Sequence, residues 1–242
     1  MNTKLLLVHG AWQGAWVWDG VVGLLAAQGV EAVAIDLPGS GEDQTPSGDV
    51  TLATYAQAIL GHARAMQPAR VVLVGHSMGG AAITAAAAAA PELLSALVYL
   101  CAFLPRQGES VAALAKEGYA LGGTGPKAEM VQEGQATRLL ADSIAETFFN
   151  DCTLEQVEAL LPRFRHQPTA PIGAPAQWSD GLRALSKHYI HCARDNAIAP
   201  RLQLAMAERA GVINVQTLDS GHEPFISQRM LMVELLLDVA HA

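Results

Sequence analysis

The sequence predicts an α/β fold in which helices cover both faces of a mostly parallel sheet. Short apolar runs, rich in β-branched residues, alternate along the chain with longer segments of helical periodicity. Most of these runs are continuously apolar, which is typical of strands that are buried on both faces. The length of 242 residues is enough for one large domain with a full hydrophobic core.

Six segments are predicted strands, and five are predicted core helices. In chain order the strands are residues 4–8, 30–35, 70–74, 97–102, 188–192 and 214–218. The helices are residues 16–28, 51–66, 81–90, 200–210 and 227–241. Because open parallel sheets bind ligands at the carboxyl ends of their strands, the loops that follow Val8, Val74, Cys192 and Leu218 are the expected location of a site.

The alternation of strands and helices stops after the fourth strand and resumes at the fifth. No strand pattern is visible between them, and two helices are expected, one over residues 136–149 and one that begins after Thr153 with a capping box. We interpret residues 105–186 as a helical cap inserted into an α/β core formed by residues 1–104 and 187–242.

Composition and charge exclude several classes of function. Hydrophobic residues make up 51% of the chain and charged residues 16%, so the chain is globular rather than disordered. A formal net charge of −8 disfavours nucleic acid and anionic membrane surfaces as partners. No apolar run approaches the ~20 residues that a membrane span needs, and no signal-peptide pattern is visible. The sequence leaves the oligomeric state open, and a homodimer is one option.

The three cysteines are an odd number, and their spacing does not match a metal site. Cys101 and Cys192 fall in predicted strands, where a buried thiol behaves as a small apolar group. We therefore expect neither a disulfide nor a bound metal, and we expect a reducing compartment, the cytoplasm.

A G-x-S-x-G motif at residues 75–79 lies between a predicted buried strand and an alanine-rich helix. In this context the serine lies at the tip of a sharp strand-to-helix turn, and the two glycines remove Cβ atoms that would clash in the tight backbone. The motif predicts that Ser77 is a nucleophile; the alternative is a glycine-rich turn that only packs the helix on the strand.

A serine nucleophile needs a general base, and the base needs a carboxylate that orients it. In the strand–turn–helix architecture the expected order is serine, acid, histidine. Asp195 follows the fifth predicted strand and His222 follows the sixth, so both should lie at the same sheet edge as Ser77. Asp219 is the rival acid, although it is only three residues from His222.

Acyl transfer also requires donors for a developing oxyanion. The backbone N–H of Met78, directly after the nucleophile, is one expected donor, and the N–H of Ala11 in the loop after the first strand is the second. An apolar pocket is expected around these groups. Its candidate wall residues, besides Met78, are Trp12, Phe103, Phe148, Phe149, Trp178, Ile198 and Phe225, although packing between helices explains the cap aromatics equally well.

These residues together resemble the α/β-hydrolase superfamily, and more narrowly the branch of plant methyl-ester esterases, hydroxynitrile lyases and related bacterial carboxylesterases. The motifs that carry the resemblance are HGAW at 9–12, DLPGSG at 36–41, VGHSMGG at 74–80, LCAFLP at 100–105, Asp195 and Gly221-His222. The resemblance implies a Ser77/His222/Asp195 triad with an oxyanion hole formed by Ala11 and Met78. It also implies hydrolysis of a small ester without a metal or organic cofactor.

The lyases of this branch carry a threonine after the first-strand histidine and a lysine after the catalytic histidine. This sequence has Gly10 and Glu223 at those positions, and Glu223 is expected to place a negative charge beside the base. The expected activity is therefore that of a carboxylesterase acting on neutral, fairly hydrophobic esters. The alternatives are a lyase, lactonase, thioesterase or perhydrolase on the same scaffold, and a non-enzymatic ligand receptor, which an intact triad disfavours.

Overall fold

The computed structural model describes residues 2–242, and its core is a six-stranded sheet in which every strand is parallel to its neighbours. The strand order is β2-β1-β3-β4-β8-β9. The bounds are β1 (Thr3–Val8), β2 (Glu31–Ile35), β3 (Arg70–His76), β4 (Ala96–Leu100), β8 (Ser186–Cys192) and β9 (Asn214–Leu218). The α/β prediction is confirmed, and every predicted strand is present within two residues at each end.

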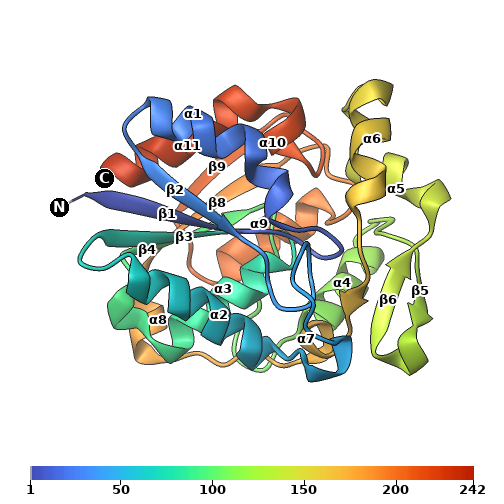
Figure 1. Cartoon of the computed structure of the whole chain (residues 1–242), viewed down its shortest axis with the longest axis horizontal. Coiled ribbons are helices and arrows are strands. Elements are labelled where there is room, and N and C mark those ends of the chain that lie inside the picture. The colour runs from blue at the N-terminus through green and yellow to red at the C-terminus, as the bar shows by residue number, and fades with distance from the viewer. Residues whose placement is uncertain (1) are drawn as a thin grey trace.

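Helices cover both faces of this sheet (Figure 1). One face carries α1 (Asp19–Ala27), α10 (Pro224–Ser227) and α11 (Arg229–His241), and the other carries α2 (Leu52–Ala65), α3 (Gly79–Ala89), α8 (Asp180–Ala184) and α9 (Pro200–Arg209). Short 3-10 helices occur at Ala15–Trp18, Ser47–Asp49, Pro91–Leu93, Gln132–Gly134 and Leu161–Arg163. None of the helices in residues 2–242 is both long enough and apolar enough to cross a bilayer.

Successive residues of the inner strands enter two different hydrophobic clusters. In β1, Leu6 packs with the cluster under α2 and α3, whereas Leu5 and Leu7 pack with the cluster under α1 and α11. In β3, Leu73 packs with the cluster under α2 and α3, and Val72 packs with the cluster under α1 and α11. Because side chains alternate between the faces and both faces are covered, the strands need apolar residues at every position.

The segment between β4 and β8 contains strands as well as helices, so the prediction of a purely helical cap is wrong. A three-stranded antiparallel sheet is formed by β5 (Ala128–Val131), β6 (Ala136–Leu139) and β7 (Gln167–Pro168). The helices of this segment, apart from α8, are α4 (Val111–Ala120), α5 (Ala141–Phe148), α6 (Leu154–Leu160) and α7 (Ala170–Gly173). The predicted capping box of Thr153 is present at the start of α6.

The predicted helix over residues 136–149 is a strand over its first four residues and a helix only from Ala141. Ala136 and Leu139 are buried, whereas Arg138 is exposed and forms an ion pair with Glu129 on the neighbouring strand. Cross-strand pairing therefore decides the conformation here, and a four-residue strand is too short for its side-chain alternation to be distinguished from a helix.

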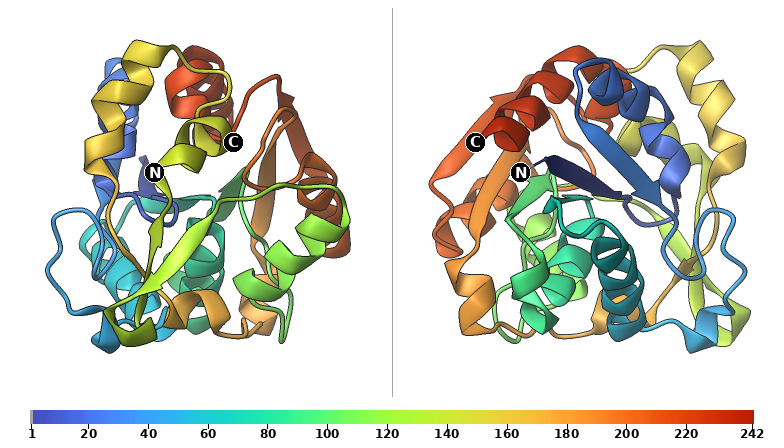
Figure 2. Two further views of the ribbon diagram at one scale, coloured as in Figure 1. Left: turned by 90° about the vertical axis from the view of Figure 1, so that its right-hand side faces the viewer. Right: turned by 60° about the vertical axis from the view of Figure 1, so that its left-hand side comes forward.

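Most of this segment lies at one end of the sheet. Figure 1 shows α4, α5, α6, β5 and β6 grouped at the end toward which β1 runs, and Figure 2 shows the same group from the front. Since the core strands are parallel, this is the end at which all their carboxyl termini meet. The inserted segment therefore covers the loops in which the nucleophile, acid and base were predicted.

Candidate active site

Ser77 lies at a strained turn between β3 and α3. Its φ of 54° falls in the left-handed region, which non-glycine residues rarely occupy. Gly75 and Gly79 allow the turn to form: a Cβ on Gly75 would lie 2.7 Å from the carbonyl oxygen of Gly79, and a Cβ on Gly79 would lie 2.6 Å from that of His9. The helix can therefore begin directly above the strand, as the motif predicted.

We expect Gly75→Ala to lower the free energy of unfolding by about 1–3 kcal/mol, because the added methyl group meets the backbone of the first turn of α3. The matched control is Gly23→Ala in α1, where a Cβ meets no atom within 4 Å. That variant should gain about 0.5–1 kcal/mol from helix propensity. Urea unfolding of both variants measures the difference, and equal stability of Gly75→Ala and the wild type would contradict the steric argument.

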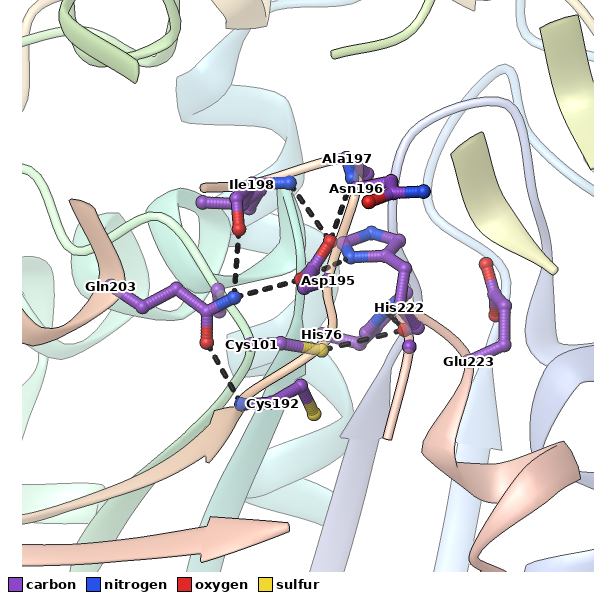
Figure 3. Close-up of polar contacts among 12 residues, drawn as sticks. His76, Cys101, Cys192, Asp195, Asn196, Ala197, Ile198, Gln203, His222 and Glu223 are labelled. Carbon is purple, nitrogen blue, oxygen red and sulfur yellow. Dashed lines mark hydrogen bonds and ion pairs between the residues drawn. The ribbon is translucent and has the colours of Figure 1, made fainter. Parts of the chain in front are cut away.

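His222 and Asp195 form a fully buried pair (Figure 3). Nδ1 of His222 lies 2.7 Å from Oδ2 of Asp195. Oδ1 of Asp195 accepts hydrogen bonds from the backbone N–H groups of Ala197 and Ile198 at 2.7 and 2.9 Å. These hydrogen bonds orient the carboxyl group so that Oδ2 accepts from Nδ1–H of His222, which leaves Nε2 of His222 free to accept a proton.

The rival acid Asp219 lies elsewhere. Its side chain is 82% exposed and forms an ion pair of 2.8 Å with Arg194.

Gln203 on α9 was not predicted as part of the site, yet its side chain supports Asp195. Nε2 of Gln203 donates to Oδ2 of Asp195 at 2.8 Å and to the carbonyl of Ile198 at 2.9 Å, while Oε1 accepts from the N–H of Cys192 at 3.0 Å. Gln203 is completely buried, so the amide holds the acid loop against the end of β8. A glutamine on an apolar helix face was the only signal of this role in the sequence.

The carbonyl of His222 is held by two side chains beneath it. Nε2 of His76 donates to this oxygen at 2.9 Å, and Sγ of Cys101 donates at 3.4 Å. Burial, followed by the neighbouring His222, lowers the pKa of His76 well below its usual value, so His76 is a neutral donor. Potential metal-ligand atoms of His76, Cys101 and His222 lie within 4.8 Å of one another. These hydrogen bonds already account for that grouping.

Nε2 of His222 is buried and has no hydrogen-bond partner among residues 2–242, the hydroxyl of Ser77 included. The imidazole of His76, the residue before Ser77, lies 4.6 Å from that of His222 between ring centroids. Serine–base hydrogen bonds are often long in unliganded sites and shorten when substrate binds.

The loop after β1 is oriented by His9. Its Nδ1 donates to the carbonyl of Gly10 at 2.7 Å, and its Nε2 accepts from the N–H of Leu37 at 3.1 Å. Burial lowers the pKa of His9, which favours this neutral, bridging form. In a trans peptide unit the C=O and N–H point in opposite directions. Holding the carbonyl of Gly10 therefore turns the N–H of Ala11 away from His9.

The N–H groups of Ala11 and Met78 donate no hydrogen bond to any acceptor in the described part of the chain. Both residues are buried, at 6% and 1% exposure, and both line the same cavity as Ser77. Buried N–H groups without a partner are rare in folded proteins. Two of them beside one serine indicate a place where an oxygen atom of a ligand can bind.

The cavity beside Ser77 has a volume of about 310 Å³ and is lined by no charged side chain. Four of the predicted wall residues line it: Trp12, Phe103, Phe148 and Ile198, together with Met78. Phe148 also lies edge-on to His222, with ring centroids 5.4 Å apart. Further apolar walls come from the inserted segment and α9: Val111, Ala115, Met130, Ile172 and Leu202.

Three predicted wall residues do not line this cavity. Phe149 packs against Phe164 in a small cluster under α5 and α6. Trp178 packs on the core, where its Nε1 donates to the carbonyl of Pro105 at 2.8 Å. Phe225 is buried behind the site against Trp18 and His76. In each case ordinary packing explains the aromatic residue, and its distance from the cavity depends on tertiary contacts that periodicity does not reveal.

The turn after α5 ties the inserted segment to both catalytic loops. Nδ2 of Asn150 donates to the carbonyl of Arg194 in the acid loop at 2.8 Å, and Oδ2 of Asp151 accepts from the N–H of Gly221 in the histidine loop at 2.6 Å. Neither residue was predicted as part of the site. The position of Phe148 on α5 is thereby coupled to the position of the imidazole of His222.

The carboxyl group of Glu223, which was expected to place a negative charge beside the base, is buried and paired with Gln13. Its side chain is 1% exposed, does not line the cavity and accepts a hydrogen bond from Nε2 of Gln13 at 2.6 Å. Burial raises the pKa of Glu223 well above its usual value. Figure 3 shows no contact between its carboxyl group and the imidazole of His222.

The sequence profile of the alpha/beta hydrolase family matches residues 5–235. The chain belongs to this family. It is 29% identical to a pyrethroid hydrolase of Sphingobium wenxiniae, over 99% of this chain and 88% of that protein. The crystal structure of a pyrethroid hydrolase from Sphingobium faniae superposes with a TM-score of 0.85, at 25% identity over 100% of this chain and 98% of that one.

A plant relative is longer than this chain. An Arabidopsis thaliana protein that carries the provisional name methylesterase 11, chloroplastic, is 28% identical over 99% of this chain. The chain spans 64% of its length, which is less than two thirds. Family membership and fold are thus established for almost the whole chain, whereas its activity and substrates are inferences from the site.

Proposed function

We propose that this protein is a serine carboxylesterase that hydrolyses neutral, fairly hydrophobic esters through an acyl-enzyme on Ser77. The observation that carries the proposal is the convergence on one uncharged cavity of Ser77 and the unpaired N–H groups of Ala11 and Met78. The relatives' names, a pyrethroid hydrolase and a methylesterase, support ester hydrolysis as the reaction class.

In the proposed mechanism, Nε2 of His222 takes the proton of Ser77 as the hydroxyl attacks the ester carbonyl. The oxyanion that forms accepts hydrogen bonds from the N–H groups of Ala11 and Met78, which are already oriented and need no reorganisation. Asp195 stabilises the imidazolium, which then protonates the departing alcohol. Water repeats the sequence on the acyl-enzyme. None of these steps calls on a metal or an organic cofactor.

The substrate class follows from the cavity walls. An ionised substrate group that entered the cavity would lose its hydration and find no charged side chain there to replace it, which costs free energy. Trp12 and Phe148 lie edge-to-face at 6.2 Å between ring centroids, and their faces suit an aromatic or bulky apolar group near the base. A volume of about 310 Å³ is at the small end for a ligand site, so one such group fills it.

Cyanohydrin cleavage is the alternative that the site disfavours. A Cβ at Gly10 would lie 2.8 Å from Cβ of Ser77 and 2.9 Å from Nδ1 of His76, so the threonine of the lyases does not fit here without a backbone shift. Glu223 occupies the position of their lysine and is buried away from the cavity.

A fluorophosphonate probe combined with an ester panel tests the proposal. We expect the probe to label Ser77 and to abolish hydrolysis of neutral aryl and alkyl esters, with carboxylate-bearing analogues turned over far more slowly. Mandelonitrile, assayed in parallel, should give no cyanide. An unlabelled Ser77 together with tight binding of an apolar ligand would indicate a receptor instead, and release of cyanide would indicate a lyase.

We also propose that the protein works in the cytoplasm. The three cysteines are all free thiols: Cys101, Cys152 and Cys192. Cysteines of proteins in a reducing compartment are usually in this state. Fractionation of the native source by immunoblotting tests this location, and recovery in an oxidising compartment or an organelle would contradict it.

A further inference from the structure

A buried side-chain contact joins the two loops that carry the proposed oxyanion donor and base. Nε2 of Gln13 donates to Oε1 of Glu223 at 2.6 Å, and the two residues are 0% and 1% exposed. Gln13 lies two residues after Ala11, and Glu223 directly follows His222. The contact therefore fixes the distance between two loops that come from opposite ends of the sequence.

The same pair leaves two oxygen atoms buried without a partner: Oε1 of Gln13 and Oε2 of Glu223. If Glu223 were ionised, neither oxygen could pair with the other, because a carboxylate oxygen and an amide oxygen both only accept hydrogen bonds. Leaving both atoms unpaired is costly. A proton on Oε2 turns that atom into a donor and gives the amide oxygen a partner.

The surroundings of Glu223 also disfavour a negative charge. Burial is the main cause that raises its pKa; the hydrogen bond from Gln13 acts in the opposite direction, and Asp195, Cys192 and Asp151 raise the pKa further. The thiols of Cys101 and Cys152 also interact with it. The nearby imidazoles are His222, which precedes it, and the neutral His76. No lysine or arginine in residues 2–242 forms an ion pair with Glu223.

We propose that Glu223 is a neutral carboxylic acid at neutral pH and that it forms a two-point pair with the amide of Gln13, with Oε2–H donating to Oε1 of the amide and Nε2–H donating to Oε1 of the acid. Glu223 is thereby a positioning residue, which holds the loop of His222 against the loop of Ala11. The positioning role of Glu223 in catalysis rests on the proposed esterase function, whereas the protonation state of Glu223 is independent of that function.

A neutral Glu223 in the fold makes the stability of the protein fall as pH rises. An ordinary glutamate ionises near pH 4.3 in the unfolded chain, whereas Glu223 keeps its proton in the fold. Above that pH the folded state binds more protons than the unfolded state, so this group lowers stability as pH rises. The effect ends only where the folded protein itself loses the proton.

Glu223→Gln tests the proposal, because a glutamine can form the same two-point pair and cannot ionise. We expect the Tm of this variant, relative to the wild type, to rise steadily between about pH 5 and pH 8, with the relative unfolding equilibrium changing by up to tenfold per pH unit. The matched control is Glu234→Gln, an exposed position on α11, which should show no such slope. A flat or falling difference for Glu223→Gln would overturn the proposal.

Two further measurements keep the proposal testable if that variant folds poorly. In wild-type protein with ¹³C-labelled glutamate, one carboxyl carbon should keep the chemical shift of a protonated acid at neutral pH, and titration of every glutamate in the ordinary range would refute the proposal. In kinetics, the alkaline limb of kcat/KM should extend to higher pH in Glu223→Gln, with the acid limb unmoved. Lack of any esterase activity would refute the proposed function and leave the stability and NMR results decisive for Glu223.

Discussion

Ser77→Ala is expected to lower kcat/KM for a p-nitrophenyl ester by about 10⁴- to 10⁶-fold. The substitution removes the only atom that can form the acyl-enzyme. It leaves in place the N–H groups of Ala11 and Met78, which account for the residual rate over water. Serine and alanine both carry a Cβ, so the strained φ of 54° costs them a similar free energy, and the stability of the fold should change little.

The matched control for this substitution is Ser95→Ala. Ser95 directly precedes β4, whose first residue is Ala96, so it lies at the end of the sheet opposite the site. That variant should keep the wild-type rate. Wild-type turnover in Ser77→Ala would show that another group performs the hydrolysis, and a large loss in Ser95→Ala would show that the assay reports folding rather than chemistry.

Asp195→Asn should lower kcat by about 10³- to 10⁴-fold. The amide oxygen of the new asparagine is expected to stay with the N–H groups of Ala197 and Ile198, which places its NH₂ group toward His222 and Gln203. Nδ1 of His222 must then accept rather than donate, so the proton moves to Nε2. An imidazole protonated at Nε2 cannot take the proton of Ser77.

The control for the acid is Asp219→Asn, which removes the rival carboxylate. Its side chain is exposed and paired with Arg194, so we expect activity within about twofold of the wild type, as for an ordinary surface substitution. Circular dichroism establishes that both variants fold. The opposite pattern, with Asp219→Asn inactive and Asp195→Asn active, would reverse the assignment of the acid.

Side chains from other elements hold the two loops of the acid and base in place. Gln203 supports Asp195 from α9, while Asn150 and Asp151 hold both loops from the turn after α5. These contacts are side chain to side chain or side chain to backbone, and those of Asn150 and Asp151 join residues 44 and 70 positions apart in the sequence. Polar residues of this kind have no motif of their own, so only the folded arrangement reveals them.

The order and type of the core elements were predictable because each depends on local patterns. A strand buried on both faces must be apolar throughout, and a sharp turn above β3 needs glycine at positions 75 and 79. The same reasoning predicted that Ser77, Asp195 and His222 follow three strands of one sheet, since the carboxyl ends of parallel strands meet at a common edge.

The sequence alone thus determined the sheet, the sharp turn at Ser77 and the set of groups at one edge, because these follow from periodicity and from backbone sterics within a few residues. Tertiary structure decided the strands of the inserted segment, the aromatic residues that reach the cavity and the burial of Glu223. Those features depend on which distant side chains exclude water from a given atom, and contacts of that kind exist only once the chain has folded.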